Sequence, residues 1–74
     1  MTITIKLFAS LRQGRFESES RALAEGSSVL DALELVGVSA AEAAVLFVNS
    51  RHAGPKHILA EGDSLAVFPP VGGG

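Results

Sequence analysis

The chain contains no cysteine, and this absence removes several kinds of chemistry. Without thiols there is no disulfide framework, no cysteine nucleophile, no thiolate zinc site and no cysteine-ligated iron–sulfur cluster. Few side chains suit acid–base catalysis either, because the 74 residues include only two histidines. Glycine, in contrast, is concentrated at the C-terminus, where three of the eight glycines are the last three residues.

Strong charge of one sign is also missing. Six Lys and Arg against eight Asp and Glu give a net charge of -2, which argues against a broad electrostatic grip on nucleic acid. No apolar run approaches the roughly 20 residues of a transmembrane helix. The N-terminus lacks the basic start, apolar stretch and cleavage site of a secretory signal. We therefore expect no nucleic-acid partner, no membrane partner and a cytoplasmic location.

A chain of 74 residues has room for one small domain. Its hydrophobic fraction of 47% is that of an ordinary globular protein. We expect a folded domain over residues 1–70, followed by a flexible, glycine-rich tail over residues 71–74.

The first quarter of the chain predicts a β-hairpin. Residues 2–7 alternate polar and apolar with period two, so that Ile3, Ile5 and Leu7 face a core. Gln13-Gly14 is a turn signal, because glycine accepts the positive φ that hairpin turns require. Residues 16–23 are expected to form the second strand, near a sheet edge, with a polar outer face. That face carries Glu17, Glu19 and Arg21.

A helix is predicted over residues 29–36. Ser28 is a candidate N-cap, and Asp31 three residues later suits a capping box. Gly37 stands where a left-handed C-cap glycine belongs. One apolar stripe at helical spacing is expected to face the core: Val29, Leu30, Leu33 and Val36.

The second half predicts strands. Residues 39–43 suit a short helical turn, and residues 44–49 are apolar on both parities, as in a strand covered on both faces or lying at a partner surface. Residues 51–53 suit a short return strand, residues 61–63 a turn, and residues 64–68 a last strand that Pro69-Pro70 ends. This order predicts an α+β domain of the β-grasp, or ubiquitin-like, type: a mixed sheet of four to five strands with one main helix packed across it.

The C-terminal tail has a chemistry of its own. Pro69 and Pro70 stiffen the exit from the sheet. Residues 71–74 span about 13 Å when extended, and glycines there can thread a narrow channel. A separate enzyme can activate the terminal carboxylate with ATP as an acyl-adenylate, and a sulfur nucleophile can then leave a thiocarboxylate. The alternative is an incidental glycine-rich end, since such termini are common.

Several motifs resemble the ubiquitin-like sulfur carriers related to the molybdopterin synthase small subunit (MoaD) and to the thiamine sulfur carrier (ThiS). Residues 7–12, Leu-Phe-Ala-Ser-Leu-Arg, resemble the Phe-Ala-x-Leu-Arg run that ends the first strand in the molybdopterin branch. Val48-Asn49 resembles the family's Val-Asn-Gly, with Ser50 in place of glycine, which leaves the turn type open. Residues 61–63 resemble Asp-Gly-Asp, and residues 68–74 are similar to the tail of both branches.

The resemblance implies a carrier that is adenylated and thiocarboxylated at Gly74, with Gly72 and Gly73 threading a partner's channel. It implies no bound cofactor, because the ATP is used by an E1-like adenylating enzyme of the MoeB/ThiF type. A second partner accepts the sulfur, such as the large subunit of molybdopterin synthase. The expected partner-binding residues are Phe68, Pro69, Pro70 and Val71. Phe68 suits a surface anchor and a core aromatic equally well.

Other candidate sites are weaker. His52 and His57 lack a third ligand nearby, so we expect no metal. No serine stands in a nucleophile elbow, and the terminal glycines are not followed by the Lys and Ser/Thr of a phosphate loop. Arg12 and Arg15 suit contacts with an acidic partner, although solvated surface charges are the preferred interpretation.

Three functions remain open on the sequence. The first is a sulfur carrier, not itself an enzyme, with molybdopterin synthesis as the leading pathway and thiamine thiazole or cysteine synthesis as alternatives. The second is a ubiquitin-like protein modifier, whose activated tail is captured by a lysine amine. The third is a passive binding module in which the tail is incidental.

Overall fold

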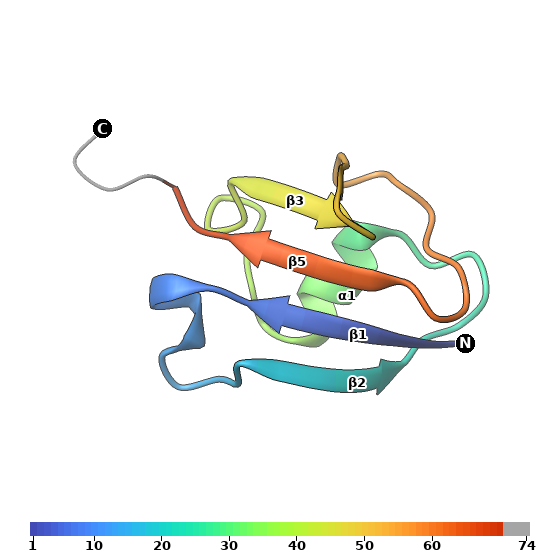
Figure 1. The fold of residues 1–74 in the computed structure, drawn as a ribbon, viewed down its shortest axis with the longest axis horizontal. Helices are drawn as coiled ribbons and strands as arrows, with labels where there is room; N and C mark the ends of the chain where they lie inside the picture. The colour runs from blue at the N-terminus through green and yellow to red at the C-terminus, as the bar shows by residue number, and fades with distance from the viewer. Residues whose placement is uncertain (71–74) are drawn as a thin grey trace.

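Five strands form one mixed sheet within residues 1–70, the part of the chain that the computed structural model describes (Figure 1). They lie in the order β2 (Ser18–Ala22), β1 (Thr2–Leu7), β5 (Ser64–Phe68), β3 (Val45–Val48) and β4 (Arg51–His52). β1 and β5 are parallel neighbours, and the other neighbouring pairs are antiparallel. The predicted tail, residues 71–74, lies outside the described residues.

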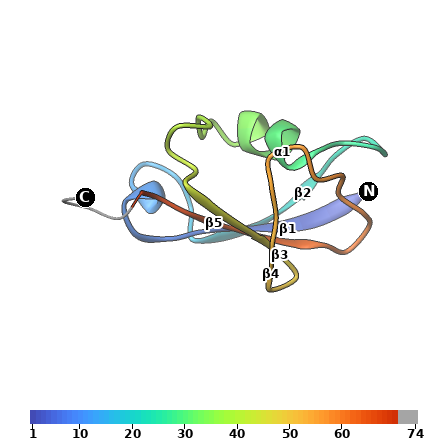
Figure 2. The ribbon, with the colours of Figure 1, turned by 90° about the horizontal axis from the view of Figure 1, so that it is seen from above.

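The core lies on one face of this sheet. The register sets Ile5 beside Leu65 and Leu7 beside Val67, and all four side chains are buried. Alternate side chains of a strand point to the same face, so the buried positions define a core side. Helix α1 (Val29–Leu35) lies on that side, as Figure 2 shows. A mixed five-stranded sheet with one helix across it confirms the predicted β-grasp fold.

Helix α1 begins with the predicted capping box. The Ser28 hydroxyl accepts from the Asp31 backbone N–H, and the Asp31 carboxylate accepts from the Ser28 backbone N–H. The predicted stripe is wrong at Leu30, whose side chain is 42% exposed. Val29 and Leu33 are buried as predicted, and Ala32 is buried with them, because residues three and four apart share a helix face. Leu30 is turned about 100° away from Val29.

Strand β2 is shorter than the predicted residues 16–23 and its faces are reversed. Its register pairs Glu19 with Ile5 and Arg21 with Ile3, so the charged parity lies on the core side of the sheet. Glu19 nevertheless stays exposed, because β2 is the edge strand. The outward parity carries the small residues Ser18, Ser20 and Ala22.

The hairpin between β3 and β4 shows which type of turn contains Ser50. Val48 pairs with Arg51, which leaves a two-residue loop of Asn49 and Ser50. Asn49 has φ 52° and Ser50 has φ 68°, and positive φ at both central residues is the mark of a type I′ turn. Serine therefore occupies a left-handed position that favours glycine.

Two loops meet at the end of the sheet from which β5 leaves. The β1–β2 connection contains a 3-10 helix, η1 (Ala9–Arg12), that the sequence did not predict. The α1–β3 connection contains the predicted helical turn, since the backbone N–H groups of Glu42 and Ala43 both donate to the Ser39 carbonyl. In Figure 1 these two loops flank the point where the chain continues past β5.

Candidate functional site

Three phenylalanines gather on the face of the sheet opposite the core. The rings of Phe8 and Phe68 are stacked with their centroids 4.3 Å apart. Phe47 meets Phe68 edge-on at 5.8 Å. Stacked and edge-to-face pairs at these distances are favourable arrangements for aromatic rings. We call this cluster of Phe8, Phe47 and Phe68 the aromatic patch.

Strand pairing brings the aromatic patch together from distant parts of the sequence. Phe68 is the last residue of β5 and pairs with Val45, while Phe47 pairs with Ala66, so both rings share the outward parity. Phe8 follows β1, where its backbone N–H donates to the Val67 carbonyl at 3.1 Å. Because β1, β5 and β3 are neighbours, the three rings come from one continuous stretch of sheet.

The aromatic patch borders a shallow depression of about 390 Å³. Its remaining lining is polar at one end and includes Lys6, Asn49 and Ser50. Ligand pockets start at about 300 Å³, so the depression has room for side chains of a partner. Apolar walls with a few polar groups suit an amphipathic partner surface.

A cationic side chain, Arg12, lies against the aromatic patch and also pairs with the exposed Glu17 carboxylate at 3.9 Å. Arg12 lies with its guanidinium carbon 5.3 Å from the centre of the Phe8 ring, and its Nε donates to the Leu7 carbonyl at 2.7 Å. The pairing register places Lys6 and His52 on the outward face, and no strand residue described on that face is Asp or Glu. Although the whole chain carries a net charge of -2, the cations Lys6 and Arg12 lie at this face, the second of them paired with Glu17.

A small hydrogen-bond network stabilises the turn beside the depression. The Asn49 amide donates to the Asp63 carboxylate at 2.8 Å and accepts from the Ser64 backbone N–H at 2.9 Å. The other Asp63 oxygen accepts from the Ala60 backbone N–H at 2.8 Å. This N–H and, second, the Asn49 amide lower the pKa of Asp63, because both stabilise its ionised form.

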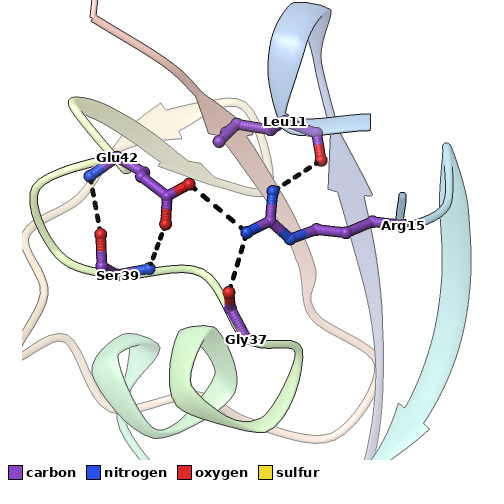
Figure 3. Close-up of polar contacts among 5 residues, drawn as sticks. All are labelled: Leu11, Arg15, Gly37, Ser39 and Glu42. Atoms are coloured by element: carbon purple, nitrogen blue, oxygen red, sulfur yellow. Dashed lines mark hydrogen bonds and ion pairs between the residues drawn. The ribbon is translucent and has the colours of Figure 1, made fainter. Parts of the chain in front are cut away.

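Arg15 is not the solvated charge that the sequence predicts. Its guanidinium donates to the carbonyls of Leu11 and Gly37 at 3.2 and 2.9 Å and contacts the Glu42 carboxylate at 3.4 Å, as Figure 3 shows. The side chain is only 22% exposed. Arg15 therefore connects η1 to the loop after α1.

A second depression, of about 430 Å³, lies where the chain leaves the sheet. Pro69 and Pro70 line it, together with residues of η1 and of the loop after α1. It lies next to the aromatic patch along the chain, because Phe68 directly precedes Pro69. The two depressions therefore adjoin each other at the C-terminal end of β5.

The predicted site residues divide into two groups. Phe68 lies half-buried on the outward face and is not part of the buried core, and Pro69 and Pro70 follow it directly. Val71, Gly72, Gly73 and Gly74 lie outside the described residues. The sequence reasoning did not assign Phe8 and Phe47 to the site, although the apolar outward parity of residues 44–49 was a signal for Phe47.

Metal and membrane sites receive no support from the described residues. Within residues 1–70, no three His, Asp or Glu side chains gather as metal ligands would. His52 instead meets Phe47 edge-on at 5.7 Å. Over the same residues, no helix has the length and apolar character needed to cross a bilayer.

Comparisons with known proteins agree with this architecture. Residues 5–74 match the ThiS family, whereas a comparison with curated proteins finds no significant match. The crystal structure of SAMP1 from Haloferax volcanii is 29% identical with a TM-score of 0.79, and the alignment covers 100% of both chains.

Two further solved structures are similar over almost the whole chain. A Pyrococcus furiosus protein assigned as molybdopterin converting factor, subunit 1, is 30% identical with a TM-score of 0.77, over 96% of this chain and 99% of that chain. A crystal structure of H. volcanii small archaeal modifier protein 1 is 27% identical with a TM-score of 0.76, over 95% of this chain and 98% of that chain.

Proposed function

This chain belongs to the ThiS family, and we propose that it is a sulfur carrier whose terminal Gly74 carboxylate is converted to a thiocarboxylate. Members of this family are small ubiquitin-like carriers or modifiers. The chemistry requires no catalytic side chain in the carrier, which fits a chain without cysteine and with two histidines.

The proposed reaction has two steps, both on a partner enzyme. A Gly74 carboxylate oxygen attacks the α-phosphorus of ATP, which forms the acyl-adenylate and releases pyrophosphate. Hydrosulfide (HS⁻) supplied by a sulfur donor then attacks the acyl carbon, a C–S bond forms, the C–O bond to AMP breaks and AMP leaves, so that sulfur replaces one carboxylate oxygen. An E1-like adenylating enzyme is the partner that this sequence of steps needs.

The observation that carries the proposal is the continuity between the aromatic patch and the tail. Phe68 belongs to the patch, and only Pro69 and Pro70 separate it from residues 71–74. A partner that covers the patch therefore holds β5, the strand that leads into the tail. Four residues can reach at most about 13 Å from that fixed point, a length that suits delivery into a buried active site.

Molybdopterin synthesis is the pathway that we propose first. Its support is the similarity to the Pyrococcus furiosus protein, together with the Phe-Pro-Pro-Val run at residues 68–71. In this pathway, the sulfur acceptor is the large subunit of the synthase, whose active site receives the tail. A thiazole or cysteine synthase would use the same tail chemistry and is the alternative acceptor.

Protein modification is a second candidate, favoured by the likeness to small archaeal modifier protein 1. In this function a lysine amine of a target attacks the activated Gly74 carbonyl and displaces the activating group, which forms an isopeptide bond. The two functions share the first activation step, so they are not exclusive.

The test is mass spectrometry of the intact chain after incubation with ATP, a sulfur donor and E1-like enzymes. We expect the mass increase of one oxygen-to-sulfur exchange, located at Gly74 by fragmentation. A variant that lacks Gly73 and Gly74 is the control and must not be labelled. If no exchange appears with any of the activating enzymes tried, the sulfur-carrier proposal is wrong.

Affinity capture from the native cell extract separates the pathways. A large molybdopterin synthase subunit in the eluate supports the first pathway, and a thiazole or cysteine synthase supports an alternative. Target peptides carrying a Gly-Gly remnant on lysine support protein modification. A passive binding module, in contrast, keeps its function when Gly73 and Gly74 are deleted.

A further inference from the structure

Arg15 joins two loops that are distant in the sequence. It follows η1, and its guanidinium bonds to Gly37, 22 residues away, and to Glu42, 27 residues away. Within the described residues these are the side-chain hydrogen bonds that connect the β1–β2 connection to the loop after α1 (Figure 3). Removing the guanidinium therefore removes these hydrogen bonds and leaves the two loops joined through the buried Leu11, Val38 and Ala43 of the core.

The acceptor of Arg15 is itself held in place. The second Glu42 oxygen accepts from the Ser39 backbone N–H at 2.9 Å, and the Ser39 hydroxyl accepts from the Glu42 backbone N–H at 3.2 Å. The Ser39 N–H, more than the Arg15 charge, lowers the pKa of Glu42, so the carboxylate is ionised at neutral pH. Arg15 thus binds a carboxylate that is fixed by its own turn.

The two joined loops form walls of the depression at the tail's root. Leu11 and Arg15 from one loop and Glu42 from the other line it, together with Pro69 and Pro70. Pro69 and Pro70, which lead into the tail, therefore lie beside the two loops that the Arg15 contacts join.

We propose that Arg15 is a positioning residue, which sets where the tail leaves the domain and thereby where the terminal carboxylate is presented for activation. This inference rests on the proposed function. Because only four residues follow Pro70, a displacement of the tail's root shifts the region that the terminal carboxylate can reach by a similar distance. A misplacement of about 1 Å can cost about 100-fold in rate.

Direct contact between Arg15 and a partner is the competing explanation. The two explanations differ in what lengthening the tail does. One extra glycine after Gly72 supplies slack and compensates for a displaced root, but it cannot replace a lost contact with a partner. The side chain's inward bonds to Leu11 and Gly37 favour positioning.

The kinetic test measures adenylation of the full chain by its E1-like enzyme. For Arg15→Ala we expect kcat to fall by about tenfold or more with a change in KM of less than about threefold, and the extra glycine to restore most of kcat. Arg21→Ala is the matched control, because Arg21 also pairs with a glutamate, Glu19, but on the edge strand β2. A raised KM that the extra glycine does not rescue overturns the proposal.

A second measurement does not depend on activation. The chain has no cysteine, so spin labels at Ser20→Cys and Val71→Cys report one distance. We expect Arg15→Ala to shift or broaden that distance, and Glu42→Gln to do so less, with melting curves showing that each variant is folded. An unchanged distance in both variants overturns the proposal. If the unaltered chain is never adenylated, the proposed function fails, while a shifted distance still supports control of the tail's root by Arg15.

Discussion

Replacing Ser50 by glycine is expected to stabilise this protein. Ser50 has φ 68° in the type I′ turn between β3 and β4, a conformation that an L-residue with a Cβ rarely adopts. Its hydroxyl forms no hydrogen bond with any described residue that would compensate for the strain. The substitution therefore removes strain and loses no contact within residues 1–70.

The size of the effect follows from two opposing terms. A left-handed conformation costs a non-glycine residue about 1–2 kcal/mol. Glycine loses more conformational entropy on folding, which costs about 0.5–1 kcal/mol. The difference is a stabilisation of about 0.75 kcal/mol at its centre, within limits of about 0 and 1.5 kcal/mol, and the central value is equivalent to a rise in Tm of about 3–6 °C for a domain of this size.

Asn49→Gly, at the neighbouring position of the same turn, is an informative comparison with Ser50→Gly. Asn49 also has a positive φ, 52°, but its amide bonds to Asp63 and Ser64. Losing two hydrogen bonds at about 1 kcal/mol each outweighs the strain that is relieved, so Asn49→Gly should lower Tm. Two neighbouring glycine substitutions are therefore expected to act in opposite directions.

Thermal unfolding followed by circular dichroism at neutral pH measures both variants against the unaltered chain. The far-ultraviolet spectrum of each folded variant serves as the control for an intact sheet. A Tm for Ser50→Gly equal to or below that of the unaltered chain refutes the reasoning about the turn.

Three further predictions follow from the described contacts. Ser28→Ala removes the N-cap of α1 and should cost about 1 kcal/mol in the free energy of unfolding, measured by urea denaturation. Glu42 and Asp63 have lowered pKa values in the folded state, so the stability that their ionised forms contribute is present at neutral pH and is lost as the pH falls below about 4. Tm measured from pH 7 to 3 should therefore drop below about pH 4. An equally large drop in a Glu42→Gln, Asp63→Asn double variant would contradict this prediction. Phe68→Ala should weaken binding to the activating enzyme at least about tenfold by calorimetry, whereas Leu30→Ala, on the helix side, should leave it unchanged.

Local features of this fold were predictable because they depend on residues a few positions apart. The alternation of residues 2–7, the capping box of Ser28 and Asp31, and the last strand over residues 64–68 were each predicted and are confirmed. Backbone conformation and neighbouring side chains determine these features, and both are written in short stretches of sequence. The family of the chain was recognisable for the same reason, since its motifs are contiguous.

Register and packing decided the rest. The period of a strand does not say which parity faces the helix, so the polar side of β2 was assigned to the wrong face. The apolar stripe of α1 included Leu30 because spacing alone does not measure how much of a helix the sheet covers. The turn at Asn49 and Ser50 required the pairing of Val48 with Arg51 before its type was known.

The sequence alone was enough to predict a small β-grasp domain, which the structure confirms, and to propose the terminal Gly74 carboxylate as the reacting group, because a chain without cysteine offers few other candidates. Only the tertiary structure brought Phe8, Phe47 and Phe68 into one patch and joined Arg15 to Glu42 beside Pro69 and Pro70. These contacts link residues 20 to 60 positions apart on neighbouring strands and facing loops. Such proximity depends on strand order, which short-range sequence patterns do not encode.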